Sequence, residues 1–194
     1  IKSLENCLNY MGAKFKKIET KEDINTAKKI IIPGVGSFDF AMSFLKKKNY
    51  ISNLKKFALI KKKPILGICI GMQILFTKGF ENGECKGLDF IGGEVKIIKS
   101  KEKKIILPIV GYQKINIQNN NFKFFNSYNN KKFYFVHSFA GNTHDLSNIL
   151  CTTVSQNVKY CSGVISERII GTQFHPEKSG EIGLNFLKDF ISEC

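Results

Sequence analysis

The sequence predicts an α/β protein in which a central, mostly parallel sheet lies in a three-layer arrangement between helices. Short apolar strands alternate with helical patterns through the first half of the chain, an order typical of parallel sheets with crossover helices. A glycine-bounded cysteine follows one of these strands and precedes a helix. The 194 residues, 43% of them apolar, suffice for one hydrophobic core. We therefore expect a single domain over residues 1–194.

The first half of the chain supplies the alternating elements. A first helix is predicted to end near Met11, because apolar residues at helical spacing stop there and Gly12 follows. The chain opens on Ile1 with this helix, so we expect the first strand of the sheet to be missing. Further strands are predicted at residues 15–18, 30–32 and 65–68, and helices at residues 38–45 and 51–59.

The second half of the chain reads mainly as strands. Turns rich in Asn and Gly separate the apolar runs, and no repeat or linker divides the chain. Residues 178–191 then form a predicted amphipathic helix that closes the domain. The predicted strands lie at residues 94–98, 105–110, 114–117, 133–136, 149–154, 163–165 and 169–174.

Composition excludes several classes of function. Thirty basic and sixteen acidic residues give a formal charge of +14, yet Arg168 is the only arginine and the lysines are spread along the chain. We interpret the excess as a solvated surface rather than a nucleic-acid groove, with a basic docking surface as the open alternative. The apolar runs are far shorter than the roughly 18 residues of a membrane span, so we expect a cytoplasmic protein. The six cysteines form no C-x-x-C pair, and we expect neither metal nor cofactor.

Cys69 is the candidate nucleophile. Residues 67–71 (GICIG) lie between the predicted strand and a helix that we expect to include Phe76. In a strand-to-helix elbow, flanking glycines let neighbouring backbone pass while the nucleophile is forced outward, and the start of the helix favours the thiolate. The pentapeptide alone leaves open the alternative of a buried cysteine in a glycine-bounded turn.

His175 is the candidate general base. It follows the predicted strand 169–174, so it reaches the same sheet edge as Cys69, and Glu177 is placed to orient its ring. His137 and His144 are rival bases. His144 lies in a loop rich in Asn, Asp and Gly and is expected to be exposed, and His137 ends a strand with no acidic residue close behind it.

The oxyanion of an acyl transfer needs backbone donors. Gly34, Val35 and Gly36 follow the strand 30–32, and their amides, with that of Ile70, are candidates; a simple strand-to-helix turn is the alternative.

In combination, these motifs resemble the class I glutamine amidotransferases, the group with a Cys-His-Glu triad, and within it the glutaminase subunits of imidazole glycerol phosphate synthases. The resemblance covers essentially the whole chain, through PGVGSF (33–38), GICIGMQILF (67–76), KGLDFIGGEV (86–95), YFVHSF (134–139) and GTQFHPEKSGEIGLNFL (171–187).

The resemblance implies hydrolysis of L-glutamine through a thioester on Cys69, with His175 and Glu177 as the other triad members. The ammonia would pass into a (β/α)₈ cyclase subunit, the partner in a heterodimer, which forms imidazole glycerol phosphate and AICAR in histidine biosynthesis. Tyr134 and Lys178 resemble positions that face this partner. The residues that resemble the glutamine site are Gln73, Glu81, His137, Ser138 and Phe139.

The chain also departs from the family pattern. Residues 108–113 read PIVGYQ where PHxGWN is common, and residues 78–84 are unusual. These departures leave open a paralogue that supplies ammonia for amidation of a bacterial surface sugar. A non-catalytic basic scaffold or RNA-binding domain is an alternative of another class, although a scaffold has no need of an intact triad.

Overall fold

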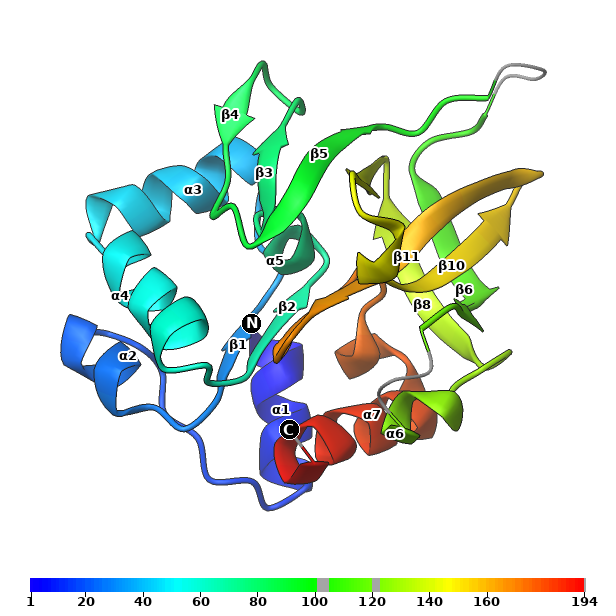
Figure 1. The fold of residues 1–194 in the computed structure, drawn as a ribbon. Coiled ribbons are helices and arrows are strands. Elements are labelled where there is room, and N and C mark those ends of the chain that lie inside the picture. The colour runs from blue at the N-terminus through cyan, green and yellow to red at the C-terminus, as the bar shows by residue number, and fades with distance from the viewer. Residues whose placement is uncertain (101–104, 120–122, 194) are drawn as a thin grey trace.

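The computed structural model describes residues 1–100, 105–119 and 123–193, and it has a central sheet with helices on both faces (Figure 1). The helices are α1 (Lys2–Tyr10), α2 (Lys21–Thr26), α3 (Phe38–Lys47), α4 (Ile51–Lys55), α5 (Ile70–Gln73), α6 (Lys123–Asn126) and α7 (Gly180–Glu193), with a π-helical turn η1 (Lys56–Ile60) and 3₁₀ turns η2 (Leu146–Asn148) and η3 (Pro176–Lys178). The strands are β1 (Ile30–Ile32), β2 (Ile65–Ile68), β3 (Phe76–Gly79), β4 (Cys85–Lys86), β5 (Ile91–Ile97), β6 (Ile109–Lys114), β7 (Asn116–Ile117), β8 (Lys132–His137), β9 (Phe139–Thr143), β10 (Ile149–Ser155), β11 (Val158–Ser166) and β12 (Ile169–Thr172).

The main sheet combines a parallel and an antiparallel part. Within the described ranges its strand order is β1-β2-β12-β11-β10-β7. β1, β2 and β12 run parallel, and the strands from β11 outward continue antiparallel. Thr172 lies opposite Ile68 in the register, so β2 and β12 leave the sheet at the same edge. The parallel part therefore brings the residues after both strands together.

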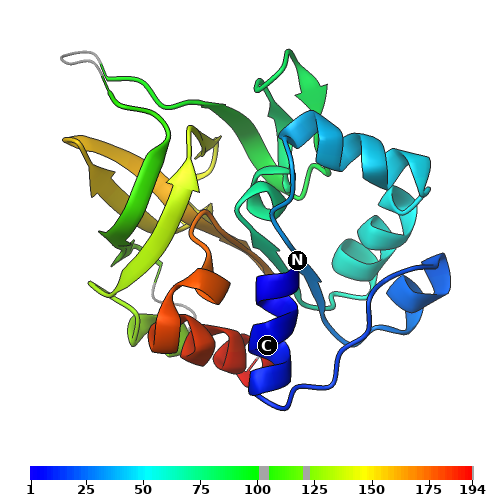
Figure 2. The same cartoon turned by 180° about the vertical axis from the view of Figure 1, so that it is seen from behind.

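Two hydrophobic clusters fill the space on either side of this sheet. Successive side chains of a strand point to opposite faces. Ile65 of β2 packs with α3 and α4, whereas Leu66 and Ile68 pack with α1 and α7. From both sides of the molecule α1 and α7 are seen next to each other, away from α3 and α4 (Figures 1 and 2). The α/β class with helices on both faces of the sheet is thus confirmed.

Two smaller sheets adjoin the main one. In the part of the chain that the structure describes, β4, β3, β5 and β9 form one, and β6 and β8 form the other. β8 ends at His137 and β9 begins at Phe139, so Ser138 is the point where the chain passes from one ladder to the other. The backbone N–H of His175 donates to the carbonyl of Tyr134 at 2.8 Å, and this bridge joins β8 to the segment after β12.

Several predicted elements differ from the structure. Residues 15–18 pair with no strand among the described residues, so the predicted strand there is wrong. The predicted helix 51–59 is α4 followed by the turn η1, and the elbow helix ends at Gln73, while Phe76 begins β3. The predicted strands 105–110 and 114–117 are replaced by β6 and β7, because Ile106 is exposed and the ladder with β8 begins at Ile109.

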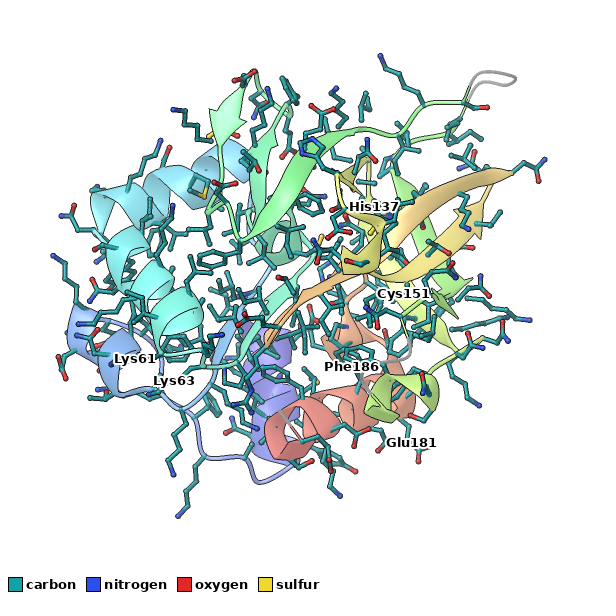
Figure 3. The ribbon with its side chains drawn as sticks, viewed as in Figure 1. Lys61, Lys63, His137, Cys151, Glu181 and Phe186 are labelled. Atoms are coloured by element: carbon teal, nitrogen blue, oxygen red, sulfur yellow. The ribbon has the colours of Figure 1, made fainter. Side chains whose placement is uncertain are left out.

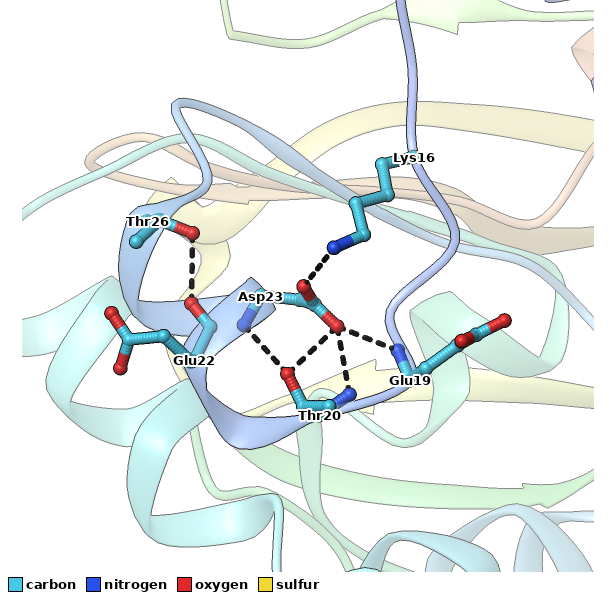
Figure 4. A network of polar contacts seen from close by, with 6 residues as sticks. All are labelled: Lys16, Glu19, Thr20, Glu22, Asp23 and Thr26. Carbon is cyan, nitrogen blue, oxygen red and sulfur yellow. Dashed lines mark hydrogen bonds and ion pairs between the residues drawn. The ribbon is translucent and has the colours of Figure 1, made fainter.

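Helix α2 was not predicted, although the sequence carries its start signal. Thr20 and Asp23 form a capping box, in which each side chain accepts from the other's backbone N–H (Figure 4). Lys16 contacts the Asp23 carboxylate at 2.6 Å. In the described residues, no helix combines the length and the apolar character needed to cross a bilayer.

Gly183 offers a test of the packing between α7 and η3. A Cβ atom at Gly183 would lie 1.8 Å from the carbonyl oxygen of Pro176, so Gly183→Ala forces the helix and the turn apart. We expect this variant to lose about 1–3 kcal/mol of unfolding free energy, measured by urea denaturation. In the control Gly92→Ala, the new Cβ meets only an atom of His144 at 4.0 Å, and stability should stay near that of the wild type. Equal stability of both variants would contradict the packing argument.

Candidate active site

Cys69 occupies a strained turn between β2 and α5. Its φ is 53° and its ψ is −109°, a conformation that L-residues rarely adopt. A Cβ at Gly67 would lie 2.4 Å from the carbonyl oxygen of Gly71, and a Cβ at Gly71 would lie 2.0 Å from that of Ile32. The two glycines therefore permit backbone approaches that any side chain would block, and this is the geometry expected of a nucleophile elbow.

The loop after β1 packs directly on this elbow. A Cβ at Gly34 would lie 2.8 Å from the Cβ of Cys69 and 3.1 Å from the backbone nitrogen of Ile70. Gly36 has a φ of 71°. Gly34, Gly36 and Ile70 all line the cavity beside Cys69, whereas Val35 is 41% exposed and lies outside the lining that the described residues form. Three of the four predicted oxyanion residues, Gly34, Gly36 and Ile70, thus share a cavity lining with Cys69.

His175 and Glu177 form a buried pair beside the same cavity. Nδ1 of His175 lies 2.7 Å from Oε1 of Glu177, and the two side chains are 7% and 11% exposed. Because a carboxylate only accepts, Nδ1 donates and Nε2 is left for other partners. Nε2 is buried and has no hydrogen-bond partner among the described residues.

The surroundings of His175 favour its protonated form. Burial lowers the pKa of this imidazole, but the proximity of the Cys69 sulfur and the hydrogen bond and charge of Glu177 raise it, and the result is a pKa of about 9. The imidazolium is therefore stabilised between the sulfur and the carboxylate. Such an arrangement suits a thiolate–imidazolium pair.

Cys69 and His175 both line a cavity of about 400 Å³. Of the predicted partner-facing residues, Lys178 belongs to this lining, and Tyr134 lies next to it, with its ring centroid 5.9 Å from the Lys178 Nζ. Among the residues that the structure describes, no cluster of His, Cys, Asp or Glu could hold a metal ion. The lining consists of Gly34, Gly36, Cys69, Ile70, Gln73, Glu81, Pro108, Val136, His137, Ser138, Phe139, His175 and Lys178.

The carbonyl of Phe139 orients two cavity residues. It lies 2.8 Å from Nδ1 of His137 and accepts from Nε2 of Gln73 at 3.1 Å. Burial is the main cause that lowers the pKa of His137, to about 4, so the imidazole is neutral, with its proton on Nδ1 and an acceptor at Nε2. His137, labelled in Figure 3, is buried at the end of β8. This ring contacts a carbonyl rather than a carboxylate, and His144 is exposed, so neither rival base has the environment of His175.

Glu81 is connected to the start of α3. Its Oε2 accepts from the backbone N–H of Phe38 at 2.8 Å, and the neighbouring Asn82 donates to Asp39 at 3.0 Å. The unusual segment 78–84 thus holds the end of the loop that carries Gly34 and Gly36.

Two contacts of the site were missed by the sequence reasoning. Nε2 of Gln173 donates to the sulfur of Cys69 at 3.6 Å, and the hydroxyl of Tyr112 donates to the carbonyl of Lys178 at 3.0 Å. Gln173 belongs to the same motif as His175, which was a usable signal. The sequence around Tyr112 carried no such signal.

Glu177→Gln should lower the pKa of His175 from about 9, because it removes the carboxylate and leaves the effect of burial. An imidazole whose pKa is higher in the folded than in the unfolded protein stabilises the fold. This stabilisation is fully present below about pH 6.5 and is lost as the pH rises to about 9. The variant should therefore show a weaker fall of unfolding free energy between these pH values. NMR titration of the histidine ring protons measures the pKa. Glu181→Gln, the same change on the exposed outer side of α7 (Figure 3), should leave the titration of His175 unaltered.

Comparison with known proteins agrees with this geometry. The family model described as glutamine amidotransferase class-I matches residues 1–194. Imidazole glycerol phosphate synthase subunit HisH 1 of Campylobacter jejuni is 39% identical over 192 residues, which cover 94% of this chain and 93% of the relative. Subunit HisH of Lactococcus lactis is 43% identical over 172 residues, which cover 89% and 83%.

Solved structures share the fold at low sequence identity. A glutamine amidotransferase superposes with a TM-score of 0.72 at 14% identity, covering 97% of this chain and 91% of the other. A glutamine amidotransferase from Thermotoga maritima gives a TM-score of 0.62 at 18% identity, covering 98% and 76%. The match over the full chain, with the curated relatives above 30% identity, establishes that this protein belongs to the class I glutamine amidotransferase family.

Proposed function

We propose that this chain is the glutaminase subunit of an imidazole glycerol phosphate synthase, and that it supplies ammonia to a (β/α)₈ cyclase subunit in the cytoplasm. The observation that carries the proposal is the placement of Cys69 and the His175–Glu177 pair at one cavity. The relatives that cover nearly the whole chain bear the name of this synthase subunit. The substrate is L-glutamine, and no nucleic acid or membrane takes part.

The first half of the reaction forms a thioester. The thiolate of Cys69 attacks the γ-carboxamide carbon of glutamine, and the carbonyl oxygen becomes an oxyanion. Backbone N–H groups of the Gly34–Gly36 loop and of Ile70 stabilise that charge in this proposal, which the place of Gly34, Gly36 and Ile70 in the cavity lining supports. His175 then transfers a proton to the amide nitrogen, the C–N bond breaks, and ammonia leaves.

The second half releases glutamate. Neutral His175 takes a proton from water, whose oxygen attacks the thioester carbon, and the sulfur leaves as the thiolate. Glu177 holds the ring and stabilises the imidazolium, which gives up its proton in the first half and forms again in the second. Gln73 and His137 each present a buried acceptor to the cavity, with Glu81, Ser138 and Phe139 completing the glutamine site.

The proposed docking face lies at the mouth of the cavity. Lys178 is exposed there, and Tyr134 packs edge-on against Tyr112, with ring centroids 5.7 Å apart. Ammonia that leaves the thioester site on this side enters a partner without passing through bulk water. In this proposal the positive charge of the many lysines keeps the protein in solution and contributes to docking of the partner.

The departures from the family pattern in residues 108–113 favour an alternative function, in which the ammonia goes to a different acceptor. Pro108 lines the cavity, Ile109 lies opposite His137 in the ladder, and Tyr112 contacts Lys178. A face altered at these positions suits a different cyclase-like partner, such as one that amidates a surface sugar. Assay with the histidine-pathway cyclase distinguishes the two. A scaffold or RNA-binding role receives no support from a cavity that Cys69 and His175 line together, with Glu177 hydrogen-bonded to His175.

Cys69→Ala should lower glutamine hydrolysis by at least about 10³-fold, because it removes the nucleophile and leaves the surrounding fold. With the cyclase and added ammonium chloride, formation of imidazole glycerol phosphate should persist, since free ammonia replaces the missing product. Glutamate release and cyclase product are measured side by side. A glutaminase rate near that of the wild type would refute the mechanism, and failure with added ammonia would refute the coupling.

Lys178→Glu should weaken the complex with the cyclase by about tenfold or more, because it reverses a charge at the proposed interface. It should also lower the ratio of cyclase product to glutamate released. The matched control is Lys188→Glu, which reverses an exposed charge on α7 and should change neither quantity. Calorimetric titration gives the affinity. Wild-type affinity and ratio in the Lys178 variant would remove this residue from the interface.

A further inference from the structure

The amide of Gln173 lies directly against the sulfur of Cys69. Its side chain is fully buried, and its Nε2 donates to Sγ at 3.6 Å. Its backbone N–H donates to the carbonyl of Ser162 on β11 at 2.9 Å, which holds the residue beside the main sheet. A buried amide so fixed is a preorganised donor rather than a mobile surface group.

The orientation of this amide follows from its neighbours. The carbonyl of Phe139 only accepts, so Gln73 turns its Nε2 toward it, at 3.1 Å. The same Nε2 lies 3.0 Å from Gln173, which must therefore present its Oε1 there. The Nε2 of Gln173 is left to face Cys69. The carbonyl of Phe139 thus fixes the orientation of the Gln73 amide, which in turn fixes that of Gln173. As a result, an N–H group rather than an oxygen faces the sulfur.

A donor at this position acts on the charged form of the sulfur. Hydrogen bonds to an ionised acceptor are stronger than those to a neutral one, so the N–H stabilises the thiolate more than the thiol. His175 supplies a proton and a charge to the sulfur, whereas Gln173 holds its proton permanently. The amide therefore supports the sulfur at the two points of the reaction where it is ionised, before it attacks glutamine and when it leaves the thioester.

We propose that Gln173 is a positioning residue for the nucleophile: its side-chain N–H, fixed by Gln73 and the carbonyl of Phe139, holds the Cys69 thiolate in place and stabilises it. The proposal rests on the proposed function in that Cys69 is the nucleophile. It adds a second, proton-retaining donor to the triad. The motif around His175 thereby supplies two groups that act on the sulfur, the imidazole of His175 and the amide of Gln173.

The test uses the full chain and the pH dependence of Cys69 alkylation. Iodoacetamide reacts with thiolates, and mass spectrometry reports the rate at Cys69 separately from that at Cys85. Gln173→Met keeps the length of the side chain and removes its N–H donor. We expect the pH of half-maximal rate at Cys69 to rise by about one unit, a roughly tenfold slower reaction below that pH. Cys85 should react as in the wild type.

A second variant separates the donor from packing. Gln173→Glu keeps the shape and the acceptor for Gln73 but lacks the permanent N–H, and its ionised form repels the thiolate. The pH of half-maximal rate should again rise. Gln118→Met, the same change at an exposed residue, should leave the profile unaltered. Circular dichroism checks that each variant is folded.

The outcomes separate the two proposals. Folded Gln173 variants with the wild-type profile at Cys69 would overturn the role of Gln173 while leaving the glutaminase proposal intact. Absence of glutaminase activity in the wild-type complex with the cyclase would overturn the proposed function, whatever the alkylation profile shows. If Gln173→Met is unfolded, the profile of Gln173→Glu decides.

Discussion

The close backbone packing under Cys69 is the constraint on which the site depends. The residue is held at a φ of 53°, and glycines at positions 34, 67 and 71 let three segments of main chain meet around it. A Cβ at any of the three would lie within 2.8 Å of a neighbouring atom. Cys69 lines the cavity directly above this packing. The Gly34 loop, the end of β2 and the start of α5 are therefore in close contact at this point.

The polar part of the cavity lining depends on a single peptide group. The carbonyl of Phe139 contacts both Gln73 and His137 and leaves each with an acceptor toward the cavity. It lies where β8 ends and β9 begins, so two ladders fix its position. The polar character of the lining is thereby set by backbone geometry as much as by side-chain identity. The elbow places Cys69 in the cavity lining, and the junction of β8 and β9 orients polar groups of the same lining.

The parts of the fold and the site that could be predicted were those encoded locally. The elbow around Cys69 and the short spacing from His175 to Glu177 carry their geometry within a few residues. Strand β9 was missed because its pairing with β5 depends on residues far away in the sequence. The Phe139 carbonyl could not be singled out, because every residue has one. Gln173 was within a recognised motif, but its contact with sulfur depends on a sheet register that the sequence does not display.

The pairing of β2 with β12 has a consequence for how the protein is made. Cys69 and Gln173 are 104 residues apart, yet Cys69 N–H donates to the carbonyl of Thr172 at 2.7 Å. During synthesis the elbow segment leaves the ribosome long before β12 and α7 exist, and closing so long a loop is costly until its contacts form. A nascent chain therefore carries an ordinary thiol with no imidazole beside it. The cavity can therefore form only after the segment that carries β12 and His175 has been made, and a partner that recognises the assembled cavity also recognises that this segment is in place.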